Sequence, residues 1–216
     1  MKRLAFLFIP AALLIGCAST NLPPSEAPPQ ETPNVNEPAG TPDTSTLTPT
    51  EQLQVGAQEA VRALRDKDMD RLAALVHPQK GVRFSPYGHV RAEQDGDRVF
   101  TAEQVKTLLQ DQTVYLWGYY DGSGEPIEMT FADYYEKFVY DQDFANAPKV
   151  AVDHIIGQGN TLINLAEVYP DARFVEYHFP GTSQYSGMDW KSLRLVFEQV
   201  DGKWYLVGIV HDQWTI

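Results

Sequence analysis

The chain has one cysteine, Cys17, among its 216 residues. Because Cys17 lies near the N-terminus, residues 18–216 contain no thiol. That absence excludes a disulfide, a cysteine-ligated metal ion and a cysteine nucleophile from the folded part of the chain. Side-chain packing must therefore hold the core, and residues 51–216 are long enough to form one domain with a real hydrophobic core.

Basic residues are also scarce. The sequence has 17 lysines and arginines against 29 aspartates and glutamates. Removal of Lys2 and Arg3 with a signal peptide leaves 15 basic residues and a net charge of −14. Such an acidic protein is poorly suited to bind nucleic acid, and equally poorly suited to adhere to anionic lipid by charge.

No hydrophobic run at the N-terminus is long enough to cross a membrane. The apolar stretch there, Leu4 to Ile15, is shorter than the roughly 20 residues of a transmembrane helix. It follows the positive charges of Lys2 and Arg3, and Pro10 interrupts it. This pattern is typical of a secretory signal peptide, which we predict over residues 1–16.

The end of this run, Leu14-Ile15-Gly16-Cys17, resembles the lipobox of bacterial lipoproteins. The resemblance implies cleavage before Cys17, a diacylglycerol on its sulfur and usually an acylated amine. Two or three acyl chains on one residue give stable anchoring, so we expect an extracytoplasmic protein that is lipid-anchored to the bacterial cell membrane through Cys17. An ordinary signal peptide with a cysteine at the cleavage point by chance is the alternative.

Residues 17–50 are rich in proline, threonine, serine and glutamate, and residues 18–50 contain no aromatic residue. Such a segment buries too little apolar surface to offset the entropy of ordering it. We predict a tether, partly of polyproline type, that spans on the order of 30 Å as a random coil. A proline-rich recognition segment is the other interpretation.

The folded part, residues 51–216, begins with signals for helices. An apolar stripe from Leu53 to Leu64 predicts an amphipathic helix with Thr50 as its N-cap. Asp68, Thr101 and Thr130 are placed to cap three further helices. Alternating or continuous apolar runs predict strands over residues 81–84, 114–119, 150–156, 173–179, 192–200 and 203–211.

Asp201-Gly202 joins the last two predicted strands and is a strong hairpin signal. With a regular register, Phe197 faces Leu206, and Arg194 and His211 share one face. Both faces of this hairpin are largely apolar, so we expect it at the centre of a sheet that is covered on both sides.

Helices followed by a long antiparallel sheet indicate an α+β fold. The order of elements over residues 51–216 resembles the NTF2-like, or SnoaL-like, cone. That resemblance implies N-terminal helices packed in a curved, mostly antiparallel sheet that leaves a pocket. The predicted helix near 130–140 departs from the common pattern of that family.

Four segments also resemble an uncharacterised group of secreted lipoproteins of Gram-positive bacteria. The group has no known activity, so this resemblance assigns no catalytic residue; it does favour a Gram-positive cell with a single membrane. The segments are His77-Pro78 with Gly81–Tyr87, Trp117-Gly118 with Asp121–Pro126, Asp189–Arg194, and Asp201–Ile216.

Motifs for known chemistry are incomplete. No histidine pair has the spacing of a zinc protease, and there is no Gly-x-Ser-x-Gly elbow. The acidic stretch 121–125 lacks the closing glutamate of a calcium loop, which favours a polar turn, and 141–146 matches no complete loop. We predict no metal site, no cofactor and no catalytic residue.

Strand parity suggests one candidate pocket. Glu176 and His178 share a face of their predicted strand, and Arg194 and His211 share a face of the hairpin. If the two faces coincide, these four side chains converge inside the curved sheet, where they suit a polar ligand or acid–base chemistry. A buried ion pair between Glu176 and Arg194, with histidines hydrogen-bonded for packing, is the structural alternative.

Two function classes follow. The first is a ligand- or protein-binding module of the cell envelope, which we favour because no catalytic motif is present. The second is an NTF2-like pocket enzyme, of hydrolase or isomerase type, that uses a histidine or a carboxylate for proton transfer. Convergence of Glu176, His178, Arg194 and His211 in an open pocket would favour the enzyme.

The anchor can be tested directly. Cys17→Ala removes the sulfur that receives the diacylglycerol, so we expect the variant to lose its lipid and to leave the membrane fraction. Intact-mass spectrometry of the membrane-bound protein should show acyl chains on Cys17 as the first residue. An unmodified Cys17, or cleavage at another bond, would contradict the prediction.

Overall fold

A computed structural model of the chain describes residues 47–93 and 96–215, all within the unit Asp43–Ile216. The predicted signal peptide, the lipobox and nearly all of the tether lie outside the described residues. None of the described helices has the length and apolar character to span a bilayer.

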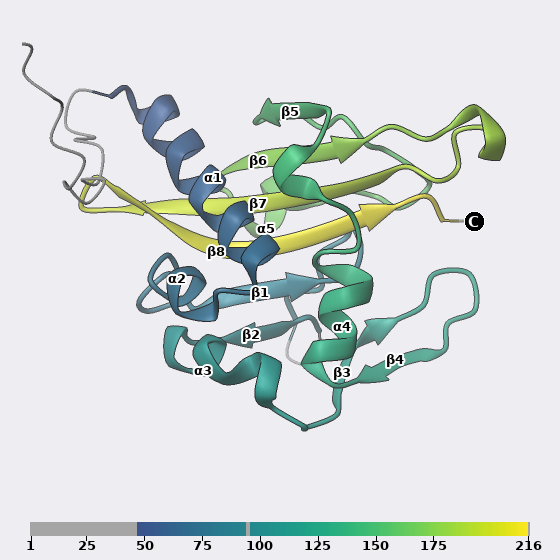
Figure 1. Cartoon of the computed structure of the whole chain (residues 1–216), viewed down its shortest axis with the longest axis horizontal. Helices are drawn as coiled ribbons and strands as arrows, with labels where there is room; N and C mark the ends of the chain where they lie inside the picture. Colours follow the sequence, from purple (N-terminus) through teal and green to yellow (C-terminus); the bar gives the residue numbers. More distant parts are fainter. Residues whose placement is uncertain (1–46, 94–95, 216) are drawn as a thin grey trace, which may run out of the picture. The chain divides into compact units, whose positions relative to one another are not determined.

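The described helices and strands alternate along the chain (Figure 1). They are α1 (Pro49–Asp66), α2 (Met69–Ala73), β1 (Val82–Ser85), β2 (Arg98–Phe100), α3 (Ala102–Thr107), β3 (Tyr115–Tyr119), β4 (Pro126–Met129), α4 (Phe131–Phe138), β5 (Lys149–Val152), α5 (Leu165–Val168), β6 (Arg173–Phe179), β7 (Lys191–Val200) and β8 (Lys203–Gln213), with short 3₁₀ turns between some of them.

Six strands form one curved sheet in the order β2-β1-β8-β7-β6-β5, and β3 pairs with β4 in a separate two-stranded sheet. All neighbours in the large sheet are antiparallel except β1 and β8, which run parallel. The predicted α+β class and mostly antiparallel sheet are therefore confirmed. The β7–β8 hairpin lies at the centre, and both residues of its turn, Asp201 and Gly202, have positive φ, as a tight hairpin of this kind requires.

A bulge in β8 changes the predicted register. Phe197 pairs with Leu206 as expected, but Val196 pairs with Gly208, so Val207 is an extra residue without a partner. Beyond the bulge every residue of β8 is displaced by one position. His211 therefore pairs with Leu193 and lies on the opposite face from Arg194, so the prediction that Arg194 and His211 share a face is wrong.

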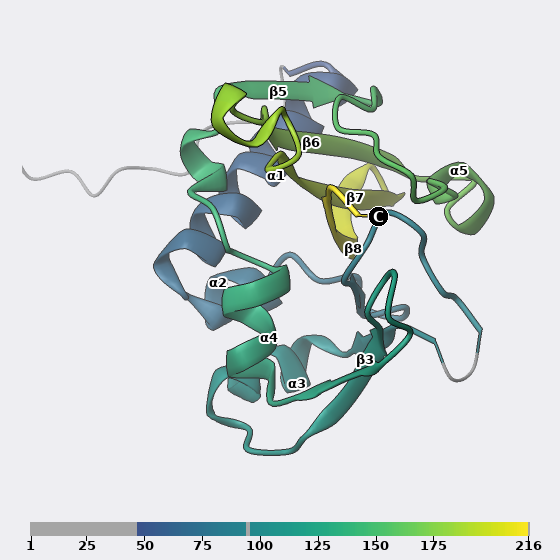
Figure 2. The same ribbon diagram turned by 90° about the vertical axis from the view of Figure 1, so that its right-hand side faces the viewer.

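Helices α1, α2 and α4 cover one face of the large sheet, called here the α1 face (Figure 2). Its core is unusually aromatic: Trp117 of β3 stacks on Tyr134 of α4 with ring centroids 4.0 Å apart, and Phe84 packs edge-on against Phe131. Helix α4, the element that departs from the NTF2-like order, thus contributes four buried aromatic side chains to this core.

The opposite face, called here the α5 face, is covered by residues 153–172, which include α5 (Figures 1 and 2). Leu165 packs there with Val196 and Val207. Asn164 fastens the covering segment to the loop after β1, because its side chain both accepts from the Val90 N–H at 2.8 Å and donates to the Val90 carbonyl at 2.9 Å.

The helix caps agree with the sequence except at the first helix. Asp68, Thr101 and Thr130 cap α2, α3 and α4 as predicted. Helix α1 begins at Pro49, and its N-cap is Thr48 rather than Thr50. Thr48 forms a capping box with Glu51. Proline is favourable at the first helical position because the N–H that it lacks would have no hydrogen-bond partner within the helix.

Three short elements were not predicted, namely β2, β4 and α5. Each has three or four residues, too few to show a hydrophobic period. The strand predicted over 150–156 ends at Val152, because Asp153 adopts a positive φ of 51°. After the second helix, His77 Nδ1 accepts from the backbone N–H groups of Gln79 and Lys80.

The cap assignment predicts a difference between two neighbouring threonines. Thr48→Ala should lower the free energy of unfolding by about 1 kcal/mol, the usual cost of losing an N-cap. Thr50→Ala removes only an exposed hydrogen bond from Arg173, so its effect should stay within about 0.5 kcal/mol. Urea unfolding of both variants measures the two values, and equal losses would contradict Thr48 as the cap.

Candidate functional site

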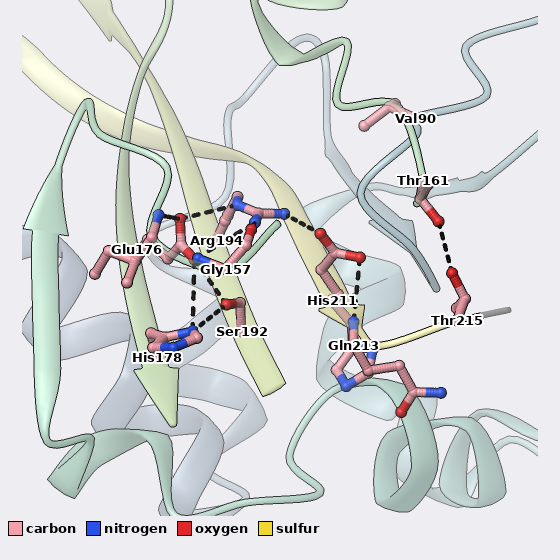
Figure 3. A network of polar contacts seen from close by, with 12 residues as sticks. Val90, Gly157, Thr161, Glu176, His178, Ser192, Arg194, His211, Gln213 and Thr215 are labelled. Atoms are coloured by element: carbon pink, nitrogen blue, oxygen red, sulfur yellow. Dashed lines mark hydrogen bonds and ion pairs between the residues drawn. The ribbon is translucent and has the colours of Figure 1, made fainter. Parts of the chain in front are cut away.

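Buried charge is concentrated at the centre of the α5 face, where β6, β7 and β8 lie side by side (Figure 3). Glu176 of β6 is directly opposite Arg194 of β7, and both are fully buried. Asp212 of β8, 1 % exposed, completes the group. A charge at this depth is stable only when partners replace the water it has lost.

Glu176 accepts hydrogen bonds both from the covering segment and from strand β7. Both of its oxygens accept backbone N–H groups of the covering segment, from Ile156 at 3.0 Å and from Gly157 at 2.8 Å. Ser192 Oγ donates at 2.7 Å, and Arg194 donates through Nε at 3.1 Å. These contacts identify Glu176 as an ionised acceptor at the centre of the network.

Arg194 joins the two carboxylates. Besides Glu176 it binds Asp212 Oδ2 through one terminal nitrogen at 2.8 Å and the Gly157 carbonyl through the other at 2.5 Å. Burial raises the pKa of Asp212, although Arg194 opposes that shift. The sequence prediction placed His211 here; the β8 bulge puts Asp212 in its position instead.

Ser192 determines the proton position on His178. Its single hydroxyl proton is donated to Glu176, so the oxygen must accept from His178 Nδ1, which lies 2.8 Å away. Neutral His178 therefore carries its proton on Nδ1 and a lone pair on Nε2. Nε2 makes no hydrogen bond within the part of the chain that the structure describes.

His178 lines a shallow open pocket of about 190 Å³, together with the indole of Trp190 and three glycines. Gly157 must lack a side chain, because a Cβ there would lie 2.3 Å from Ser192 Oγ. Burial lowers the pKa of His178, and Lys149 and Arg194 act in the same direction, while Glu176 opposes them. The pocket wall thus holds a neutral imidazole over most of the physiological pH range.

His211 belongs to a different group on the α1 face. Its Nδ1 contacts the Pro86 carbonyl at 3.1 Å and its Nε2 contacts both Asp141 oxygens at 3.2 Å. Asp141 also pairs with Lys191. Burial would raise the pKa of Asp141, but the contacts with His211 and Lys191 outweigh it and lower the pKa. Of the four predicted pocket residues, three therefore meet and His211 does not.

Another buried carboxyl, Asp97, lies near β1. Burial raises its pKa to about 6, against the opposing influence of the Ser85 hydroxyl and the Arg91 N–H. One Asp97 oxygen, Ser85 Oγ and Tyr134 Oη make no well-formed hydrogen bond among the described residues. No sequence signal marked this carboxyl, and it has no neighbouring base such as Glu176 has in His178.

The two acidic segments considered for metal binding form a turn and a set of local hydrogen bonds. Residues 121–125 form an exposed turn between β3 and β4, and Asp143 accepts from Tyr140 and Asn146. Within residues 47–93 and 96–215, no cluster of three or more histidine, aspartate or glutamate side chains is arranged to hold a metal ion.

Comparisons with known proteins find only distant structural similarity. No protein-family model matches the chain, and no curated protein of similar sequence was found. Three solved structures each align with 77 % of this chain. An NTF-2 like protein of unknown function from Shewanella oneidensis has 11 % identity and a TM-score of 0.35 over 100 % of its own chain, and a putative calcium/calmodulin dependent protein kinase II association domain from Xanthomonas campestris has 16 % identity and a TM-score of 0.31 over 86 % of its chain. A putative dehydratase from the NTF2-like family from Streptomyces avermitilis has 13 % identity and a TM-score of 0.27 over 96 % of its chain. At TM-scores below 0.5 these alignments say nothing about ligand or activity.

The buried network predicts that replacing Arg194 with methionine lowers the free energy of unfolding more than the same replacement at Arg173. Arg194→Met leaves Glu176 and Asp212 buried without their cation, so the free energy of unfolding should fall by about 3–5 kcal/mol. Arg173→Met on the same sheet breaks a partly exposed pair with Asp153 and should cost at most about 1 kcal/mol. Denaturant unfolding at neutral pH compares them, and similar losses would contradict a structural role of Arg194.

Proposed function

We propose that this chain is a lipid-anchored, extracytoplasmic protein whose domain binds one group of a small ligand in the His178 pocket. One observation carries the binding proposal: His178 Nε2 is an unpaired acceptor in an open pocket, and its orientation is fixed from behind by Ser192 and Glu176. A small number of well-placed polar groups beside an aromatic wall is typical of ligand sites.

The size of the pocket limits what it can accept. Sites that enclose a whole drug-sized molecule usually measure about 300–1,000 Å³. At about 190 Å³ the His178 pocket suits a ring or a short polar group, with the rest of the ligand outside. Since Nε2 accepts, that group presents an N–H or O–H donor, and it lies beside the Trp190 indole.

A larger groove of about 450 Å³ lies between α1 and the β5–β6 edge. Aliphatic side chains such as Val55 and Val150, with glutamines of α1, make up much of its lining. These flexible or apolar groups define no ligand orientation. The His178 pocket is therefore the better candidate, although an envelope protein remains an alternative partner for the groove.

The anchoring part of the proposal depends on the lipobox at Leu14–Cys17 and on the acidity of the chain. A net negative protein gains little from anionic lipid, so the acyl chains on Cys17 would be its membrane link. The tether of residues 17–50 would hold the domain away from the bilayer and leave its pocket open to the extracytoplasmic space.

A fragment screen tests the binding site. The lipidated full chain in detergent micelles is screened by thermal shift with small heteroaromatic and hydroxylated compounds. His178→Ala should weaken hits about fivefold, the equivalent of one hydrogen bond. His154→Ala, at an exposed position in the segment after β5, should leave affinity unchanged. Hits that bind His178→Ala as tightly as the parent would contradict the site.

A further inference from the structure

We propose that His178 acts as a proton acceptor toward the group seated in its pocket, with Ser192 and Glu176 as a relay that stabilises the imidazolium. The inference rests on the proposed ligand site and adds a chemical role to it. Its basis is the chain of contacts from Glu176 Oε1 to Ser192 Oγ at 2.7 Å and from Ser192 Oγ to His178 Nδ1 at 2.8 Å.

The relay places the basic nitrogen where a ligand can reach it. Nδ1 is engaged by Ser192 and His178 lines the pocket, so Nε2, with its lone pair, is the nitrogen left to meet a ligand. Figure 3 shows His178 at one end of the network, with Ser192 between it and Glu176. A buried carboxylate behind a histidine is an arrangement that orients an imidazole and stabilises its protonated form.

Both negatively and positively charged groups lie near His178. Glu176 favours the imidazolium, whereas Arg194 and Lys149 disfavour it. Arg194 is itself neutralised by Glu176 and Asp212. Burial lowers the pKa of His178 more than Glu176 raises it, so the imidazole stays neutral, and able to accept a proton, at a pH where many histidines are already charged.

The proton transfer is simple to write. The O–H or N–H bond of the ligand group breaks and its electron pair stays on the ligand atom. The proton moves to Nε2, while the Nδ1–H continues to donate to Ser192, whose own proton stays directed at Glu176. His178 becomes an imidazolium, and return of the proton restores the starting state. No oxidant, reductant or cofactor is required.

Neighbouring groups are less suited to the role. Ser192 is fully buried and its proton is engaged by Glu176, so it is not placed to act as a nucleophile. His211 is fully buried, and both of its nitrogens contact acceptors, the Pro86 carbonyl and Asp141. Among these groups, His178 alone combines a free nitrogen with a pocket.

Two measurements on the lipidated full chain in detergent micelles test the role. A long-range proton–nitrogen correlation spectrum of histidine-labelled protein reports which ring nitrogen is protonated. We expect neutral His178 to be the Nδ1–H form, which is the minor tautomer of free histidine. A predominant Nε2–H form would overturn the proposal, whether or not a ligand has been found.

The second measurement is the rate at which diethylpyrocarbonate acylates each histidine, followed by peptide mass spectrometry. A neutral, accessible imidazole nitrogen attacks a carbonyl carbon of the reagent, so His178 should react and His211 should not. Between about pH 7.5 and pH 6 the rate at His178 should fall less than that of added N-acetylhistidine, because the His178 pKa is lowered.

Substitution at Ser192 separates the relay from simple packing. Ser192→Ala should slow acylation of His178 about fivefold, the rate equivalent of one hydrogen bond, and Ser192→Thr should restore it. Exposed His154 controls for changes in overall reactivity. An unreactive His178, or a rate unaffected by Ser192→Ala, would overturn the relay. Fragment binding that depends on His178 would still support the ligand site in that case.

Discussion

The buried contacts among Glu176, Arg194 and Asp212 are the constraint on which the rest of the α5 face depends. One cation and two carboxylates are removed from water there, and only a complete set of partners makes this tolerable. Because Gly157 and Ile156 supply some of those partners, the network also fixes the segment that covers the sheet. It aligns three strands and the pocket wall at once.

The two faces of the sheet differ in role: the α1 face holds most of the hydrophobic core, and the α5 face holds the candidate site. On the α1 face, aromatic side chains from α4 and the β3–β4 sheet fill the interior, as the stacking of Trp117 on Tyr134 shows. These side chains form core beneath α4, while a groove of about 450 Å³ lies between α1 and the β5–β6 edge of the same face. The α5 face has less aromatic packing and is where an imidazole with a free nitrogen, His178, reaches an open pocket. The proposed function therefore depends on the α5 face.

Much of the fold was predictable because its signals are local. Alternating or continuous apolar runs located β6 to β8, and Asp201-Gly202 located the β7–β8 hairpin. The grouping of Glu176, His178 and Arg194 was also predictable, since parity within a strand assigns each residue to a face. Asp212 could not be foreseen, because one unpaired residue, Val207, changes the face of everything after it and leaves no mark in the apolar pattern.

The sequence by itself determined the class of fold, the central hairpin and the expectation of a lipid anchor at Cys17, because these depend on neighbouring residues along the chain. Only the tertiary structure decided which face carries the candidate site, which acid pairs with Arg194 and which nitrogen of His178 is free. Those properties arise from contacts between strands and loops distant in sequence. Their physical cause is burial, since a polar group deprived of water must find its partners wherever the fold places them.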